Sequence, residues 1–133
     1  MRIEDGGGVA KNQQYGDFFY WDYDGFDWLI ECKATREKSF PIANLRAEQM
    51  AKLKTYQEVS AHHRSVIAIN FYGQNLKEVN DCILINYTAY EHLVKAALEA
   101  GRASIPRKWL EECGRLQKRV QGGLWALDFG GLA

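Results

Sequence analysis

Residues 17–33 carry the pattern that most restricts how this chain can fold. Aromatic side chains that favour strands crowd positions 18–23, and Asp24-Gly25 is a strong signal for a tight turn. A second strand-like stretch runs from Phe26 to Lys33, so the segment predicts a β-hairpin. Side chains alternate between the two faces of a strand. The return strand therefore projects one set from one face, Leu29, Glu31 and Lys33, and the other set from the opposite face, Trp28, Ile30 and Cys32.

Three further strand patterns follow. The short apolar runs 65–72 and 82–87 predict buried strands, and 124–129 predicts a last strand or extended arm. Residues 34–42 form a connection in which Pro41 excludes a central strand, and 74–81 is a polar loop. Strands and helices alternate along the chain, which predicts an α/β fold with a mixed central β-sheet flanked by helices.

Helix patterns occupy the intervening segments. Asn44 is a candidate N-cap for a helix of about 45–62, and Gln49 lies beside its apolar stripe, so it can face inward. Thr88, with Glu91 three residues on, predicts a capping box for a second helix that ends at Gly101. A third helical stretch opens at Ser104-Ile-Pro106 and ends at Gly122-Gly123. The expected apolar positions are Met50, Leu53, Tyr56 and Val59 in the first helix, Leu93, Val94, Ala97 and Leu98 in the second, and Trp109, Leu110 and Leu116 in the third.

Length and composition limit the class of protein. A chain of 133 residues with 47% hydrophobic residues predicts one domain at 17–133, preceded by a flexible Gly-rich lead-in at 1–16. No apolar run is long enough to span a membrane and no signal peptide is visible, so we expect a cytoplasmic protein without a membrane partner. The three cysteines lie far apart, and neither they nor the adjacent His62-His63 favour a zinc site.

The formal net charge is zero, but the charges are segregated along the chain. Residues 1–31 carry a net charge of −5 and residues 32–64 carry +4; residues 65–100 carry −2, residues 101–121 carry +4 and residues 122–133 carry −1. Neutrality argues against an indiscriminate polyanion binder. The segregation is compatible with chance, or with a cation site set in a phosphate-binding surface.

Asp17 and Glu31-Cys32-Lys33 form the arrangement most informative about chemistry. Two carboxylates on adjacent strands of a hairpin can converge on one divalent cation, to which the Cys32 carbonyl could add an oxygen ligand. Lys33 faces the same side as Glu31 and can stabilise charge that develops on phosphate. The alternative is an ordinary cross-strand ion pair on a surface. Asp22, Asp24 and Asp27 are competing acids that we expect to serve the turn or face solvent.

The segment from Glu31 to Gln49 resembles the signature of the RecU family of Holliday-junction resolvases, within the PD-(D/E)xK nuclease superfamily. Its Glu-Cys-Lys-Ala-Thr, its Ser-Phe-Pro-Ile followed by Asn44, and its Gln49 occur in the family's order. Asp17 and the Asp24-Gly25 turn lie where the family has its catalytic Asp and hairpin turn. Gly101-Arg-Ala-Ser-Ile105 and Trp125-Ala-Leu-Asp-Phe129 resemble later family blocks, so the resemblance covers about residues 17–129.

The resemblance implies a restriction-endonuclease-like nuclease domain. It implies a homodimeric, Mg²⁺-dependent endonuclease, with Mn²⁺ as an alternative metal, that serves DNA recombination and repair by resolving four-way junctions through paired symmetric nicks. The catalytic residues it implies are Asp17, Glu31, Lys33 and Gln49, and the metal ligands are Asp17, Glu31 and the Cys32 carbonyl. The DNA-binding residues it implies are Thr35, Arg36, Lys38 and Arg46, and the alternative role for Thr35, Arg36 and Lys38 is to position the site. A bacterial cell or a phage-infected bacterium is the implied setting.

The chain departs from the family pattern at the N-terminus. Only 16 residues precede Asp17, fewer than the family's N-terminal helix and junction-inserted stalk require. The chain is then either a reduced, phage-like member or lacks an N-terminal portion, which bears on junction specificity more than on hydrolysis. The alternatives are a PD-(D/E)xK nuclease for other DNA structures, a catalytically inactive DNA-binding accessory protein, and a protein-interaction domain.

Overall fold

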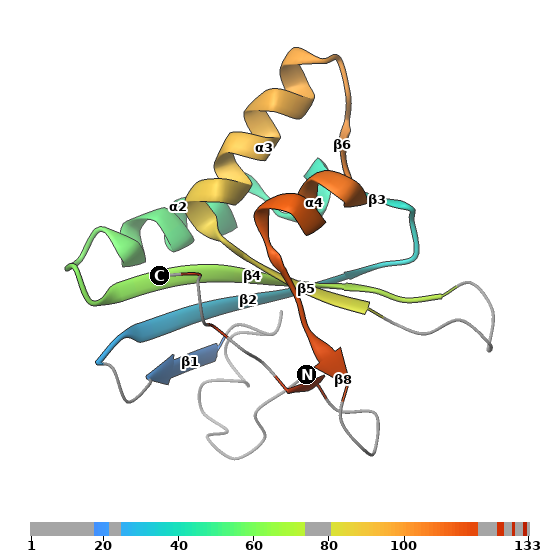
Figure 1. Cartoon of the computed structure of the whole chain (residues 1–133). Helices are drawn as coiled ribbons and strands as arrows, with labels where there is room; N and C mark the ends of the chain where they lie inside the picture. Colours follow the sequence, from blue (N-terminus) through green and yellow to red (C-terminus); the bar gives the residue numbers. More distant parts are fainter. Residues whose placement is uncertain are drawn as a thin grey trace.

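The computed structural model describes residues 18–21, 25–73, 81–119, 125–126, 129 and 132. Among them, a mixed five-stranded sheet of order β1-β2-β4-β5-β7 is flanked by three α-helices (Figure 1). In chain order the elements are β1 (Phe18–Trp21), β2 (Asp27–Thr35), β3 (Ser39–Pro41), the 3₁₀ helix η1 (Ile42–Asn44), α2 (Ala47–Gln57), β4 (His63–Phe71), β5 (Asp81–Asn86), α3 (Tyr87–Glu99), β6 (Ser104–Pro106), α4 (Arg107–Cys113), β7 (Arg115–Leu116), β8 (Lys118–Arg119) and β9 (Trp125–Ala126). The predicted α/β fold is confirmed and is consistent with a restriction-endonuclease-like architecture.

Strand β2 organises the sheet. It pairs antiparallel with β1, from Phe18 opposite Ile30 to Trp21 opposite Asp27, which confirms the predicted hairpin. On its other side it pairs parallel with β4 along its whole length, ending at Thr35 opposite Phe71. Parallel neighbours need a crossover connection, and α2 supplies it. The hydroxyl of Ser65 on β4 donates a hydrogen bond of 2.6 Å to the Leu53 carbonyl, which ties α2 to the sheet.

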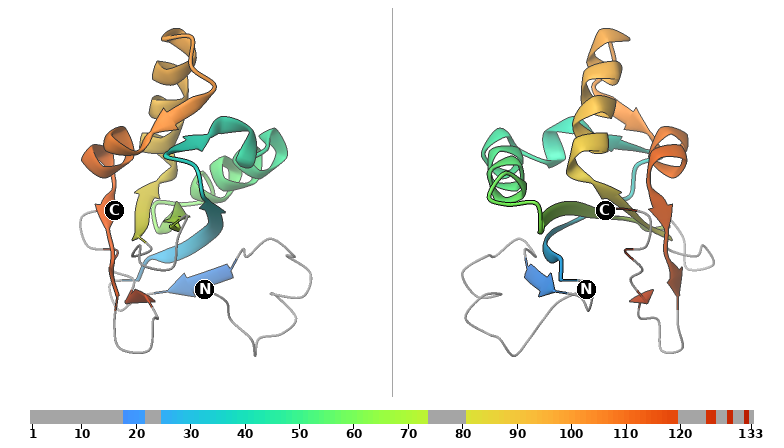
Figure 2. Two further views of the ribbon diagram at one scale, coloured as in Figure 1. Left: turned by 90° about the vertical axis from the view of Figure 1, so that its right-hand side faces the viewer. Right: turned by 60° about the vertical axis from the view of Figure 1, so that its left-hand side comes forward.

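The predicted alternation along β2 separates two apolar clusters. Leu29 packs with Ile67 and Ile69 of β4 under side chains from α2, α3 and α4. Trp28 and Ile30 pack on the other face with Val66 and Leu84, and Phe129 and Leu132 cover part of that face. The three helices lie on the same side of the sheet (Figures 1 and 2). None of the helices among the described residues has the length and apolar character that a membrane crossing requires.

Several predicted helix boundaries are wrong. Asn44 belongs to η1 and does not cap α2; Arg46 holds the N-cap position, and α2 spans 47–57 rather than 45–62. Helix α3 begins one residue before Thr88, because the Asn86 side chain accepts a hydrogen bond of 2.8 Å from the Ala89 amide and is the cap.

The later part of the chain also differs from the prediction. Ser104–Pro106 is a short strand, which pairs antiparallel with β3, and only 107–113 is helical. Leu116 lies on β7 rather than on a helix. The expected apolar positions Val59, Leu98 and Leu116 are exposed. The predictions at Gly122-Gly123 and in the polar loop up to residue 80 fall outside the described residues, and of the predicted last strand the structure describes β9.

Candidate active site

Glu31 and Lys33 lie at the centre of β2, on the face that α2 covers. The Glu31 side chain is only 1% exposed and that of Lys33 is 15% exposed. The Lys33 ammonium Nζ lies 3.7 Å from Glu31 Oε2. The period of two in β2 therefore brings the two charges together on one face, as the sequence predicts.

On the β4 side, Glu31 has apolar neighbours. Its register partner on β4 is Ile67, and that of Lys33 is Ile69; both isoleucines are fully buried. A carboxylate in such surroundings costs free energy unless it is paired or binds a cation. A buried charge in the middle of a core strand is far more expensive than the surface ion pair that was the alternative interpretation, so the burial favours a functional role.

Gln49 reaches the same side of the sheet from the first turn of α2. Its side chain is 7% exposed, which confirms that it faces inward. Its side-chain Oε1 accepts a hydrogen bond of 3.0 Å from the Arg46 backbone N–H. The backbone N–H of Gln49 in turn donates to the Arg46 carbonyl at 3.0 Å. The carboxamide is thus held in place by the helix start, and its Nε2 group is the donor that could serve a catalytic role.

The end of β2 and the loop after it hold three of the predicted DNA-binding residues. Thr35 is buried, and its Oγ1 accepts a hydrogen bond of 3.0 Å from the Glu37 amide. For Thr35 this placement favours the positioning role over direct contact with DNA. Arg36 and Lys38 are exposed on either side of Glu37, and the Arg36 guanidinium carbon lies 5.4 Å from the centre of the Tyr72 ring.

Three other predicted site residues remain, which are Arg46, Cys32 and Asp17. The Arg46 side chain is half-exposed and forms an ion pair of 3.1 Å with Glu48 at the start of α2. Cys32 is half-buried against the second apolar cluster, on the face opposite Glu31. Asp17 lies outside the described residues. It directly precedes Phe18 in the sequence, and Phe18 pairs with Ile30, the neighbour of Glu31.

Among the described residues, no group of three or more His, Cys, Asp and Glu side chains is arranged to hold a metal ion. The described part of the site nevertheless offers one hard oxygen ligand, the buried Glu31 carboxylate, of the kind that Mg²⁺ and Mn²⁺ prefer. That part of the site fits the implied metal.

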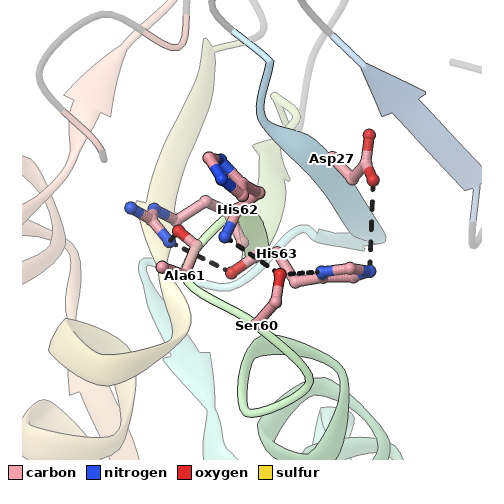
Figure 3. Close-up of polar contacts among 6 residues, drawn as sticks. Asp27, Ser60, Ala61, His62 and His63 are labelled. Atoms are coloured by element: carbon pink, nitrogen blue, oxygen red, sulfur yellow. Dashed lines mark hydrogen bonds and ion pairs between the residues drawn. The ribbon is translucent and has the colours of Figure 1, made fainter.

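A second polar cluster lies at the opposite end of β2. His63 Nδ1 forms a hydrogen bond of 2.7 Å with Ser60 Oγ, and its Nε2 lies 4.0 Å from Asp27 Oδ2 (Figure 3). Asp27 and His63 are register partners at the start of the parallel strands. The cluster thus fastens the turn after α2 to the first residue of β2. Asp27, predicted to face solvent, is half-exposed.

The comparison with protein families agrees with this geometry. The model of the RecU family, described as recombination protein U, matches residues 9–126, most of the chain and all of the site. The chain belongs to the RecU family. A comparison with curated proteins found no match. RecU membership implies a recombination function of the Holliday-junction resolvase type, which is a nuclease-type activity directed at branched DNA.

One neighbour of this RecU site escapes sequence reasoning. Tyr72 reads as the last residue of an apolar strand, but its ring contacts Arg36 from the loop after β2. The two residues are 36 positions apart, so only the register of β2 against β4 brings them together. The contact could have been predicted only from a parallel pairing that places Thr35 opposite Phe71.

Proposed function

We propose that this RecU protein is a Mg²⁺-dependent endonuclease that resolves four-way DNA junctions by paired symmetric nicks. The observation that carries the proposal is the buried Glu31 carboxylate with the Lys33 ammonium 3.7 Å away, within a chain of the RecU family. A charge pair with this burial is expensive to keep for stability alone. Phosphodiester hydrolysis would explain why the pair is kept. The proposed setting is a bacterial cell or a phage-infected bacterium.

Each site residue has a proposed role. Glu31, Asp17 and the Cys32 carbonyl are the proposed ligands of the metal, and Mn²⁺ is an alternative to Mg²⁺. When bound, the metal would supply Lewis-acid stabilisation of charge on the phosphate oxygens. Lys33 stabilises the negative charge that grows on the reacting phosphate. Gln49, fixed by its bond to the Arg46 amide, orients the attacking water or a ligand.

Paired nicks require two active sites. A four-way junction presents two equivalent strands, so a two-fold symmetric homodimer is the simplest assembly that can cut both. We therefore propose a homodimer, for which sedimentation or light scattering at working concentration is the test. A monomer under those conditions would contradict coordinated double nicking.

The central experiment is cleavage of a synthetic four-way junction with and without Mg²⁺, by the unaltered protein and by Glu31→Gln. This variant keeps the shape of the side chain but removes the charge, and we expect it to lose at least about a hundredfold in rate. Glu99→Gln is the matched control, since Glu99 is an exposed residue at the end of α3. Its rate should equal that of the unaltered protein.

The same assay separates the alternatives. Equal cleavage of junction and linear duplex would indicate a nuclease for other DNA structures. DNA binding without cleavage in either metal would indicate a catalytically inactive accessory protein. Cleavage by Glu31→Gln at the unaltered rate would exclude Glu31 from the reaction.

A further inference from the structure

Strands β2 and β4 end together, and their last residues bring an arginine onto an aromatic ring. Thr35 lies opposite Phe71, and the Tyr72 amide then donates a hydrogen bond of 3.1 Å to the Thr35 carbonyl, which extends the pairing by one residue. Arg36 follows Thr35 directly. Its guanidinium lies 5.4 Å from the centre of the Tyr72 ring, within the range of a cation–π contact.

From this geometry we infer that Tyr72 is a positioning residue, which holds the Arg36 guanidinium ready for a DNA phosphate that flanks the cleavage site. The inference rests on the proposed function, because it assumes that DNA lies along the carboxyl end of β2. Arginine is suited to this role, since its planar fork matches phosphate oxygens and stacks on aromatic faces at the same time.

The Tyr72 ring lies outside the apolar core of the described part of the chain. It is half-exposed and belongs to neither of the two apolar clusters, so it contributes little to the core. The loop that it meets is also constrained, because Thr35 is buried and its hydroxyl holds the Glu37 amide. Arg36 is thereby fixed at its backbone by the Thr35 turn and at its head group by the Tyr72 ring.

The position of this pair indicates a flanking phosphate and not the scissile one. Four residue steps along β2 separate Glu31 from Thr35, or about 13 Å of strand. The Arg36 backbone therefore lies well beyond the reacting groups beside Glu31, which favours a flanking phosphate as the partner of its guanidinium. Its loss should weaken DNA binding and leave the chemical step unchanged.

A double-mutant cycle on junction binding tests the inference. Binding is measured across a salt series in the Glu31→Gln background, with Arg36→Ala, Tyr72→Leu, Tyr72→Phe and the double variant Arg36→Ala/Tyr72→Leu. Removal of one phosphate contact should lower the slope of log K against log salt by about one in Arg36→Ala. Tyr72→Leu should weaken binding roughly two- to fivefold, and Tyr72→Phe should restore it because the ring remains. The double variant should bind no more weakly than Arg36→Ala.

The chain offers a matched control at the other end of the same strands. The Arg64 guanidinium lies 4.5 Å from the centre of the Phe26 ring, which is the same kind of pair placed away from the site. Phe26→Leu should leave junction affinity unchanged even where it lowers thermal stability. Single-turnover cleavage in the unaltered Glu31 background should show that Tyr72→Leu raises the half-saturating DNA concentration and keeps the maximal rate.

The outcomes distinguish this inference from the proposed function. If Tyr72→Leu binds as tightly as the parent, or if its effect simply adds to that of Arg36→Ala, Tyr72 does not act through Arg36. The unaltered protein would then still cleave junctions. If the unaltered protein neither binds nor cleaves junction DNA, the proposed function itself is wrong.

Discussion

Replacement of Lys33 by methionine tests whether the Glu31–Lys33 pair is a functional charge pair held at a cost to the fold. The substitution keeps most of the aliphatic stem and removes the ammonium 3.7 Å from Glu31 Oε2. The Glu31 carboxylate would then remain buried beside Ile67 without that countercharge. Lys33→Met should therefore destabilise the protein as well as abolish cleavage.

The geometry gives the magnitude of the loss. At 3.7 Å and an effective dielectric constant of about 20, Coulomb's law gives an attraction of about 4.5 kcal/mol, which is an upper bound. Removal of one partner of a buried pair costs about 3–5 kcal/mol. Because Lys33 retains some exposure and relaxation recovers part of the loss, we expect Lys33→Met to lower the free energy of unfolding by about 2–4 kcal/mol.

Replacement of the other partner, Glu31, should cost much less stability. In Glu31→Gln the buried charge is gone, and the partly exposed Lys33 ammonium can turn toward water. We expect a change of no more than about 1 kcal/mol, and we expect the double variant Glu31→Gln/Lys33→Met to recover most of the stability that Lys33→Met loses. Urea unfolding monitored by tryptophan fluorescence measures all three variants, with Lys95→Met on the exposed surface of α3 as control.

Magnesium supplies a second readout that does not depend on activity. A cation bound at Glu31 would replace the lost ammonium, so millimolar Mg²⁺ should stabilise Lys33→Met by about 1.4 kcal/mol at a concentration ten times its dissociation constant. The same concentration should not stabilise the double variant. Glu31 and Lys33 do not form such a pair if the effects of the two single substitutions add within about 0.5 kcal/mol, or if Glu31→Gln is as destabilising as Lys33→Met.

Three further predictions concern the scaffold. A Cβ on Gly114 would lie 2.6 Å from the Leu84 carbonyl oxygen, so Gly114→Ala should cost about 2–3 kcal/mol in urea unfolding, more than an alanine at Gly101, where the backbone is left-handed but the space is open. Asn86→Ala removes the cap of α3. It should lower the free energy of unfolding by about 1 kcal/mol, which a lower melting temperature would show. Burial raises the pKa of Cys82 from 9.0 to about 12. As the pH rises, the thiol therefore loses its proton at a lower pH in the unfolded chain than in the folded one. Stability should therefore fall as the pH rises above 9, by about 1.4 kcal/mol at pH 10, and Cys82→Ala should lack this component.

The parts of the fold that could be predicted are those with local signals. The turn signal at Asp24-Gly25 and the alternation from Phe26 to Lys33 predict the hairpin, and the alternation assigns each side chain of β2 to a face. The same alternation puts Glu31 and Lys33 on one side, so their proximity follows from the period of the strand alone. What the pattern cannot give is the burial of Glu31, because that depends on β4 and α2 packing around it.

The errors occur where a distant segment decides the structure. Ser104–Pro106 has the composition of a helix start, but its backbone pairs with Ser39–Pro41, more than 60 residues earlier. The beginning of α2 is similar. Asn44 is a good N-cap by residue type, yet it is the last residue of η1. The start of α2 is instead closed by the Gln49 side chain, which accepts a hydrogen bond from the Arg46 backbone N–H. Residue preference names several candidates for a cap, and only the path of the chain selects one.

The zero net charge of the chain also acquires a structural meaning. In the basic stretch 101–121, Arg107 is paired with Asp81 and Glu111 and lies over the Phe71 ring, so its charge is largely neutralised within the fold. The other basic stretch places Arg36 and Lys38 on the loop directly after the strand that carries Glu31. A phosphate approaching that loop meets a local positive field that the average over the chain does not show. Because fields of this kind are screened within about 10 Å at moderate salt, the attraction to DNA that we propose should be confined to this loop and its immediate surroundings. A neutral protein can therefore bind a polyanion at one place without coating it.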